Sequence, residues 1–351
     1  MQSVLQINHT SIDFHQADWE QMLRVSLNDH TEQEGFVSFL KEWFNDSDFI
    51  TAHSSGSTGE PKPIQLNKEW MRRSAEITRD FFHIPNGAIA LLKLPISFIA
   101  GKMMVVRAIE NNWHLITAIP NSKVDWANIE ITFAAFTPMQ VDAFLQENKE
   151  KYQKIKTVII GGGKTSDASW NVISTCSNSN YLTYGMTETC THVAVQEVSS
   201  KNQNGFFKAL PGVRFSIDDR TCLAIEAKHL GDQIIRTNDL VELKSEQTFV
   251  LVGRVDRIIN SGGRKIFPEK LEDLFQGEWN TPFYFCDRAD DKLGSQLVLV
   301  IQEKEGLPLE KIQSDIERSL AKYDRPKEIC IKRQLKYTHT GKLIKKWFEN
   351  E

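Results

Sequence analysis

The chain has 351 residues, 40% of them hydrophobic, and a formal net charge of -4. This length suggests about two domains with substantial cores, and the small net charge gives no electrostatic reason to expect nucleic acid or an anionic membrane as partner. The five cysteines are widely separated and form no CxxC pair, which argues against a zinc site or a disulfide framework.

The first residues, MQSVLQINHTSIDFH, contain no basic region followed by an apolar core. The sequence also has no uninterrupted apolar stretch of about 18 residues, the length that a membrane-spanning helix needs. We therefore predict a reduced, soluble, cytoplasmic protein without stable membrane insertion.

The first strong structural signal is a helical pattern of apolar residues in FVSFLKEWF, residues 36–44. The segment HSSGSTGEPKP that follows is too rich in Gly, Ser and Pro for a helix or strand, so we expect a loop. Asn67 is a suitable cap for a helix over NKEWMRRSAEITRDFF, and AIALLKLP then predicts a buried strand.

Further along the chain, IKTVII predicts a strand, SDASWNVIS a helix and YLTY another strand. This order indicates a parallel sheet with a right-handed crossover. From Leu223 onward, LAIEAK, QIIRT, LVELK and FVLVG predict short antiparallel strands. The segments FYFC, QLVLVIQ, LEKIQSDIERSLAKY and KEICIK then suit a small α+β unit. We place the two domains at residues 1–252 and 253–351.

The segment IGGGKTS resembles a phosphate-binding loop at first sight. The P-loop of the common NTPases needs a second glycine five residues before Gly163, and Val158 stands there. This spacing argues against a Walker-type kinase.

A better phosphate site is the upstream loop SSGSTGEPK, residues 54–62. Its hydroxyl groups alternate with glycines, so backbone N–H and side-chain O–H groups can converge on phosphate oxygens without a Cβ in the way. Lys62 adds a charged donor. On composition alone, the segment is equally compatible with an ordinary surface turn.

A second candidate is YGMTET, which follows a predicted strand and so lies at the carboxyl end of the sheet, where open α/β folds bind ligands. Tyr184 can stack on a flat heterocycle, Thr187 can bond a phosphate and Glu188 can hold Mg²⁺. The alternative is a strand end with a solvated glutamate.

Two further segments complete a recognisable series: RTNDLVEL with GRVDRIINSGGRKIFPEKLE, and THTGKLIKK near the C-terminus. With all four motifs in this order, the chain resembles the adenylate-forming superfamily of acyl-CoA synthetases, peptide synthetase adenylation domains and luciferases, from about Thr51 onward. The resemblance implies a large N-terminal α/β domain with a parallel sheet and an antiparallel β subdomain, and a small, mobile C-terminal α+β domain.

The resemblance also implies roles for individual residues. Lys342, Thr187 and Glu188 would be catalytic, with Glu188 as the Mg²⁺ ligand. Asp239 would hold the ribose hydroxyls with help from Arg254, Asp256 would lie at the domain hinge, and SGGRKIFP would line the tunnel for the thiol. The nucleotide would contact Ser54, Ser55, Gly56, Ser57, Thr58, Gly59, Lys62, Gly161, Gly162, Gly163, Tyr184, Gly185, Asp239 and Arg254.

Within the superfamily, YGMTETCT and the short chain resemble o-succinylbenzoate-CoA ligases of menaquinone biosynthesis, with ATP, Mg²⁺ and CoA as cofactors and substrates. The acid would contact Phe98, Lys102, Gly185 and His192, although relatives often have a histidine where Phe98 stands. Lys102 and Arg107 are either pocket cations or ordinary surface groups. Lys345 and Lys346 are read as a solvated face.

Three alternatives stay open: a CoA ligase for another aryl or short-chain acid, the Walker-type kinase disfavoured above, and a non-catalytic adenylate-binding sensor. The presence of Lys342, Glu188, Asp239 and Arg254 together argues against the sensor. We expect a small carboxylic acid and CoA as partners, no nucleic acid, and allow for a homodimer.

Overall fold

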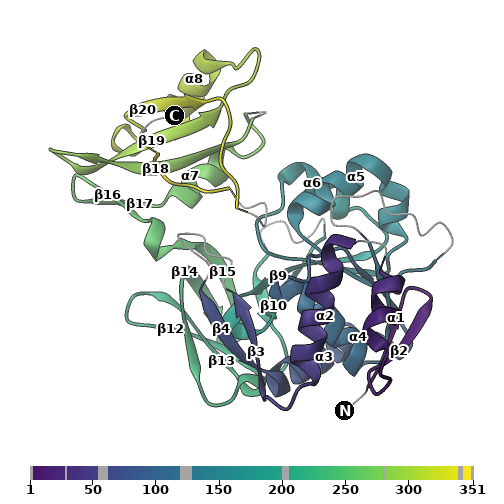
Figure 1. Cartoon of the computed structure of the whole chain (residues 1–351). Coiled ribbons are helices and arrows are strands. Elements are labelled where there is room, and N and C mark those ends of the chain that lie inside the picture. Colours follow the sequence, from purple (N-terminus) through teal and green to yellow (C-terminus); the bar gives the residue numbers. More distant parts are fainter. Residues whose placement is uncertain are drawn as a thin grey trace.

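The computed structural model describes residues 3–27, 30–53, 62–118, 129–199, 205–279, 281–338 and 343–348. These residues form two lobes, each built on its own β-sheet (Figure 1). The larger lobe contains the N-terminal part of the chain, and the smaller lobe contains α7, α8 and the last strands.

The sheet of the larger lobe changes character near its middle. Across it, the described strands follow one another in the order β12 (Val213–Ile217), β13 (Cys222–Ala227), β14 (Ile234–Ser245), β15 (Thr248–Arg254), β11 (Phe207–Ala209), β10 (His192–Glu197), β9 (Ser179–Gly185), β8 (Thr157–Ile160), β7 (Phe133–Phe136), β5 (Ile89–Leu92), β6 (His114–Thr117), β1 (Val4–Ile7) and β2 (Thr10–Asp13). Neighbouring strands from β9 to β1 are parallel. The strands from β12 to β10 pair antiparallel.

Helices cover both faces of the parallel part. In β5, Ala90 and Leu92 belong to one core with α2 (His30–Phe44), α3 (Lys68–Phe81) and α4 (Ile99–Glu110), whereas Leu91 belongs to a second core with α5 (Pro138–Gln153) and α6 (Asp167–Ile173). This alternation follows from the two-residue period of a strand, and it explains why the strand itself, IALL, is apolar at every position. Helix α1 (Trp19–Ser26) packs near the β2 edge.

The remaining elements of the fold are one hairpin and several short 3₁₀ turns. The hairpin of β3 (Phe49–His53) and β4 (Pro63–Asn67) is a separate antiparallel pair. Short 3₁₀ turns follow three of the strands: η1 (Thr187–Thr189), η2 (Lys228–Leu230) and η3 (Val255–Arg257). A fourth, η4 (Lys322–Asp324), follows a helix of the smaller lobe. Strand β4 lies beside η1.

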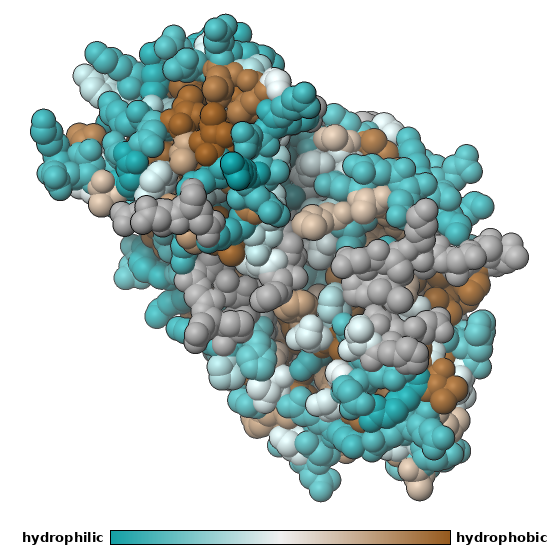
Figure 2. Space-filling view, turned by 45° about the horizontal axis from the view of Figure 1, so that its top comes forward, coloured by the Kyte–Doolittle hydropathy of each residue, from teal (hydrophilic) through white to brown (hydrophobic). Residues whose placement is uncertain are grey.

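The smaller lobe has a mixed sheet of β17 (Arg264–Ile266), β16 (Ile259–Ser261), β19 (Gly294–Gln302) and β18 (Phe283–Asp290), with β20 (Glu328–Lys332) parallel to β19. One face packs on α7 (Pro268–Phe275) and α8 (Leu309–Ser319), because Phe275, Ile316 and Leu299 belong to one buried hydrophobic core. The other face holds Leu343 and Trp347 of the C-terminal segment. Most of the surface in Figure 2 is hydrophilic, with a hydrophobic patch on the smaller lobe.

These observations confirm the predicted fold class and most of the predicted elements. Two expectations are wrong in detail: QIIRT and LVELK form one continuous strand, β14, and the C-terminal helix ends at Ser319 rather than Tyr323. The domain division at residue 253 stays a prediction. Strand β15 continues in the large sheet to Arg254, and the first strand of the small sheet begins at Ile259.

The capping role of Asn67 provides a test of the local fold. Its side chain accepts hydrogen bonds from the backbone N–H groups of Glu69 and Trp70, at 2.8 and 3.4 Å. We expect Asn67→Ala to lower the free energy of unfolding by about 1 kcal/mol, because α3 loses its N-terminal acceptor. Urea titration measures this change. Asn67→Ser, which keeps an acceptor, should stay close to the unchanged protein, and equal losses in both variants would contradict the capping role.

Candidate active site

The segment YGMTET lies at the carboxyl end of β9, as predicted. Tyr184 and Gly185 end the strand, and Thr187–Thr189 form η1. The hydroxyl of Thr189 bonds Met186 N and the carbonyl of Thr191, at 2.9 and 2.6 Å, so the turn is fixed by its own side chain. Thr187 is buried, and Glu188 is half-buried on the same turn.

Gly185 is required by the close approach of β10. A Cβ at this position would lie 2.4 Å from the carbonyl oxygen of Thr191 and 2.6 Å from the Cα of His192. Both are backbone atoms, so a side chain would force the strands apart. The structure thus explains Gly185 through packing, and its predicted contacts with nucleotide and acid remain predictions.

Tyr184, Asp239 and Arg254 meet through direct hydrogen bonds, although they come from three different strands. The Tyr184 hydroxyl donates to Asp239 Oδ2 at 2.5 Å, and Arg254 Nη1 donates to Oδ1 of the same carboxylate at 3.3 Å. Asp239 and Arg254 are register partners on β14 and β15. Burial, together with the negative charge of Asp239, raises the pKa of Tyr184 above its usual range. This phenol therefore stays protonated and serves as a donor.

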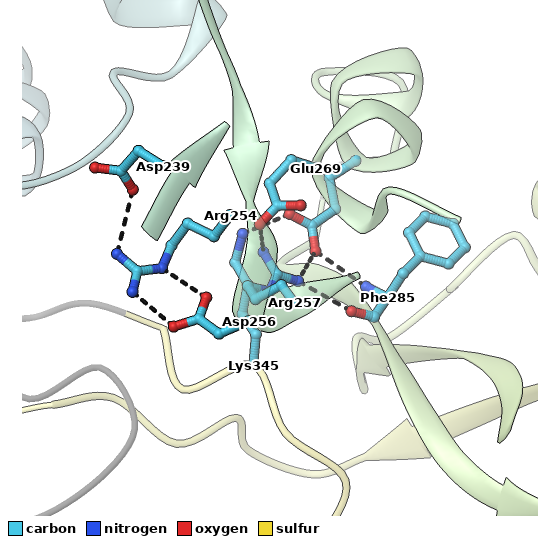
Figure 3. A network of polar contacts seen from close by, with 8 residues as sticks. Asp239, Arg254, Asp256, Arg257, Glu269, Phe285 and Lys345 are labelled. Carbon is cyan, nitrogen blue, oxygen red and sulfur yellow. Dashed lines mark hydrogen bonds and ion pairs between the residues drawn. The ribbon is translucent and has the colours of Figure 1, made fainter. Parts of the chain in front are cut away.

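Arg254 also holds Asp256, which begins the connection to the smaller lobe. Its Nε and Nη2 donate to both oxygens of Asp256, at 2.9 and 2.7 Å, in a bidentate pair. Desolvation alone would raise the pKa of Asp256, but the hydrogen bond and charge of Arg254 outweigh it and hold the pKa below its ordinary value. The predicted ribose carboxylate and the predicted hinge residue thus share one guanidinium (Figure 3).

The predicted phosphate loop joins the ends of the β3–β4 hairpin, whose last pair is His53 with Pro63. Of the predicted phosphate contacts, Lys62 is exposed beside β4. The others, Ser54, Ser55, Gly56, Ser57, Thr58 and Gly59, lie outside the described residues. Strand β4, which follows this loop in the sequence, lies beside the turn that carries Glu188.

Glu188 fits the predicted Mg²⁺ ligand. Its carboxylate makes no ion pair with any residue in the described part of the chain. The same part contains no group of three or more His, Cys, Asp or Glu side chains that could enclose a metal. Mg²⁺ commonly takes one or two carboxylates and completes its shell with phosphate oxygens and water. This residue set therefore suits an ion brought in with a nucleotide.

Gly161, Gly162 and Gly163 follow β8 at the same edge of the sheet. Gly162 has φ +89°, which side chains rarely adopt, and a Cβ on Gly161 would lie 2.5 Å from Thr183 Oγ1. Lys164 forms an ion pair with Asp273 of α7, and Gln276 Nε2 donates to the Thr165 carbonyl at 3.4 Å. This loop therefore contacts the smaller lobe through Lys164 and Thr165.

Arg107 is not a surface group, so that alternative was wrong. It is 1% exposed on α4, and its Nη2 donates to Thr191 Oγ1 at 2.7 Å. The same hydroxyl lies 3.1 Å from His192 Nδ1. Desolvation lowers the pKa of Arg107 to about 9, which leaves it charged at neutral pH. Arg107 forms no ion pair within the described residues, so it is a buried cation without a charged partner there. Its partner Thr191 follows the YGMTET motif by two residues.

The other predicted acid-binding residues lie around the same helix. Phe98 is half-buried at the start of α4, and His192 is buried on β10. Lys102 donates to the carbonyl of Thr51 at 2.9 Å and lies over the ring of Phe39, 5.4 Å from its centroid. Burial lowers the pKa of Lys102. This lysine already has a backbone partner, so its role toward the acid stays a prediction.

At the C-terminus, the predicted catalytic Lys342 lies outside the described residues. Lys345, three positions later, is not a solvated residue as expected: its side chain is 31% exposed and its Nζ lies 2.5 Å from Glu272 Oε2. No pattern in the sequence could have indicated this pair, because the two residues lie 73 positions apart. Across the described residues, no helix combines the length and apolar character that crossing a membrane requires.

Comparisons with known proteins agree with this arrangement. A family model described as AMP-binding enzyme matches residues 9–240. The crystal structure of an acyl-CoA synthetase (AMP-forming)/AMP-acid ligase II-like protein from Dyadobacter fermentans is 30% identical, with a TM-score of 0.59, and the match covers 92% of this chain and 95% of that one. O-succinylbenzoate coenzyme A synthetase (MenE) from Bacillus subtilis, in complex with ATP and magnesium ion, has a TM-score of 0.73 at 18% identity, over 84% of this chain and 68% of that one.

Among curated proteins, the 2-succinylbenzoate–CoA ligase of Staphylococcus epidermidis is 22% identical over 326 residues, which cover 85% of this chain and 69% of that protein. The enzyme of the same name from Enterococcus faecalis is 24% identical over 343 residues, covering 85% and 68%. These matches confirm the predicted resemblance, fold and enzyme class. The predicted use of ATP, Mg²⁺ and CoA agrees with these relatives: the Bacillus subtilis structure is a complex with ATP and magnesium ion, and the curated proteins are named as CoA ligases.

Two buried histidines predict how stability depends on pH. Desolvation lowers the pKa of His192 well below its usual value and that of His229 to about 4. Below pH 6.5 the unfolded chain takes up protons on both residues that the folded protein does not, so the free energy of unfolding should decrease as the pH falls. Each histidine contributes a slope of about 1.4 kcal/mol per pH unit between its two pKa values.

Urea unfolding at pH 5.5 and 4.5 measures this slope. His229→Leu should reduce it by the contribution of one histidine, whereas His83→Leu, at a largely exposed turn, should leave it unchanged. The same slope in the unchanged protein and in His229→Leu would contradict the assignment.

Proposed function

Because the chain belongs to the AMP-binding enzyme family, we propose that it is an o-succinylbenzoate–CoA ligase that works through an acyl-adenylate. The curated relatives named above support this substrate, and the buried Arg107 carries the proposal within the chain itself. A place in menaquinone biosynthesis, the cytoplasm and a homodimer are parts of this proposal that remain predictions.

Arg107 favours an acid with two carboxylates. A buried cation is costly unless a partner neutralises it, and the described partners of Arg107 are uncharged: Thr191 Oγ1, Thr78 Oγ1 at 3.4 Å and Met104 Sδ at 3.7 Å. o-Succinylbenzoate has one carboxylate that is activated and one that stays free. The free carboxylate would supply the missing negative charge, which an acid with a single carboxylate cannot do.

The first half-reaction turns a carboxylate into a good electrophile. Oxygen of the acid attacks the α-phosphorus of ATP, the bond to the β-phosphate breaks and pyrophosphate leaves. Donors of the loop from Ser54 to Lys62 would hold the leaving group, and Lys342 would lie between the acid and the α-phosphate. When bound at Glu188, Mg²⁺ would neutralise charge on the phosphate oxygens.

The second half-reaction transfers the acyl group to the sulfur of CoA and releases AMP. The thiol needs access to the acyl carbon, and a lobe that presents Lys342 would obstruct it. We propose that the smaller lobe rotates about Asp256, so that the hairpin of β16 and β17 replaces Lys342 at the site. The position of Asp256, between the last strand of the large sheet and the first of the small one, supports this hinge.

Replacing Lys342 by alanine should separate the two half-reactions. Pyrophosphate release from ATP and acid should slow by about a hundredfold or more, because a positioned cation is lost. Thioester formation from supplied acyl-adenylate should be retained. Lys327→Ala, an exposed lysine of the same lobe, should leave both rates unchanged. Equal losses in both half-reactions of Lys342→Ala would contradict this division of roles.

Arg107 can be tested with a matched pair of acids. Arg107→Gln should raise the KM for o-succinylbenzoate by about tenfold or more, since a charged hydrogen bond contributes about 1.5–3 kcal/mol. The KM for ATP should not change. For 4-oxo-4-phenylbutanoate, which lacks the ring carboxylate, the variant and the unchanged protein should have similar KM values.

A pyrophosphate-release screen over aromatic and aliphatic acids, with and without CoA, tests the substrate itself. Preference for an acid with a single carboxylate would exclude o-succinylbenzoate. The same effect of Arg107→Gln on both acids of the pair would exclude a contact between Arg107 and the ring carboxylate. Lys102→Met, at the second predicted cation, shows whether that residue contributes to the KM for the acid.

A further inference from the structure

The C-terminal segment 343–348 returns to the smaller lobe and is held there at several points. Leu343 forms an antiparallel bridge with Tyr337, and Ile344 N donates to the carbonyl of Lys336 at 2.8 Å. Tyr284 donates from its hydroxyl to the carbonyl of Lys346, also at 2.8 Å. The segment that begins directly after Lys342 is therefore tied to the face of the small sheet opposite α7 and α8.

One ion pair joins this segment to α7. Lys345 Nζ lies 2.5 Å from Oε2 of Glu272, a carboxylate that is 9% exposed. The other oxygen of Glu272 accepts hydrogen bonds from Arg257 Nη2 at 2.9 Å and from the backbone N–H of Phe285 at 3.1 Å. Groups from three separate parts of the lobe therefore bind the two carboxylate oxygens. Glu272 fixes the positions of Lys345, Arg257 and Phe285 relative to one another.

The backbone connects this network to a second group of ion pairs at the proposed nucleotide site. Arg257 follows Asp256 directly in the chain, and Asp256 is bound by Arg254, which also reaches Asp239. Figure 3 shows two groups of polar contacts, one from Asp239 through Arg254 to Asp256 and one around Arg257 that reaches Lys345, and the peptide bond between Asp256 and Arg257 joins them. The residue proposed to hold ribose is thus connected to the segment that follows Lys342.

We propose that Glu272 is a positioning residue for adenylation: by binding Lys345, it aligns the segment that carries Lys342. This inference rests on the proposed function. Leu343, which follows Lys342 directly in the sequence, is anchored by its bridge to Tyr337. An error of about 1 Å in the position of a reacting group can cost about a hundredfold in rate. Glu272 does not touch substrate in this mechanism and acts only through Lys345.

Two variants break the ion pair from opposite sides, Glu272→Gln and Lys345→Met. We expect each to lower kcat for pyrophosphate release about tenfold or more, with KM values for ATP and acid within about threefold. Thioester formation from supplied acyl-adenylate should stay within about twofold. The double variant should be no slower than the slower single variant, since both remove one interaction. If Glu272→Gln fails to fold, Lys345→Met, at a partly exposed residue, still gives the test.

Two neighbouring glutamates on and after α7 provide matched controls. Glu269 binds Arg257 at 2.9 Å but forms no ion pair with Lys345, and Glu278 is exposed. Glu269→Gln should therefore keep most of the adenylation rate, and Glu278→Gln all of it. An equal loss in Glu269→Gln and Glu272→Gln would overturn the proposal, because the effect would then run through Arg257.

Amide hydrogen exchange separates this inference from the proposed substrate. Glu272→Gln and Lys345→Met should both speed exchange at Ile344 N, whereas Glu278→Gln should not. Faster exchange with an unchanged kcat, or loss of both half-reactions together, would overturn the positioning role. If o-succinylbenzoate is not a substrate, the same variants are measured with the acid that the screen identifies. A wrong substrate and a wrong role for Glu272 therefore give different results.

Discussion

The guanidinium of Arg254 holds two carboxylates at once, and the proposed site depends on this arrangement. Asp239 belongs to the large sheet, whereas Asp256 belongs to the connection between the lobes. Partly exposed ion pairs contribute little to stability, about 0–1 kcal/mol each, so the main effect is geometric. A nucleotide that engaged Asp239 would change the environment of Arg254 and hence of Asp256. In the proposed mechanism, Arg254 would therefore link substrate binding to the position of the smaller lobe.

The parallel sheet explains why distant segments meet at one edge. Gly161 follows β8, η1 follows β9 and α4 begins shortly after β5, and all three strands run in the same direction. Loops at the carboxyl ends of parallel strands lie side by side, which is where α/β folds bind ligands. Two helical layers bury both faces of this part of the sheet, so the strand ends are held on a rigid support.

The predicted site residues near this edge fall into two groups, those accessible to solvent and those buried below the surface. Glu188 and Lys62 keep access to solvent, as groups that bind phosphates or a metal ion need. Arg107 and His192 are buried behind the turn, where one cation and one neutral imidazole share the hydroxyl of Thr191. In such an environment a bound carboxylate interacts more strongly with the arginine than it would in water. The specificity of the proposed acid pocket would thus depend on the burial of Arg107 as well as on its charge.

The superfamily, the main elements and the motif at Tyr184–Thr189 could be predicted from the amino-acid order, because they depend on local spacing, periodicity and strand ends. The motifs also identified Asp239 and Arg254, which the fold then placed as partners on adjacent strands. The burial of Arg107 and the ion pair of Lys345 with Glu272 became evident with the folded chain. A charged side chain looks the same in sequence whether it lies in water or in a core, and long-range ion pairs arise from chain packing rather than from any local pattern.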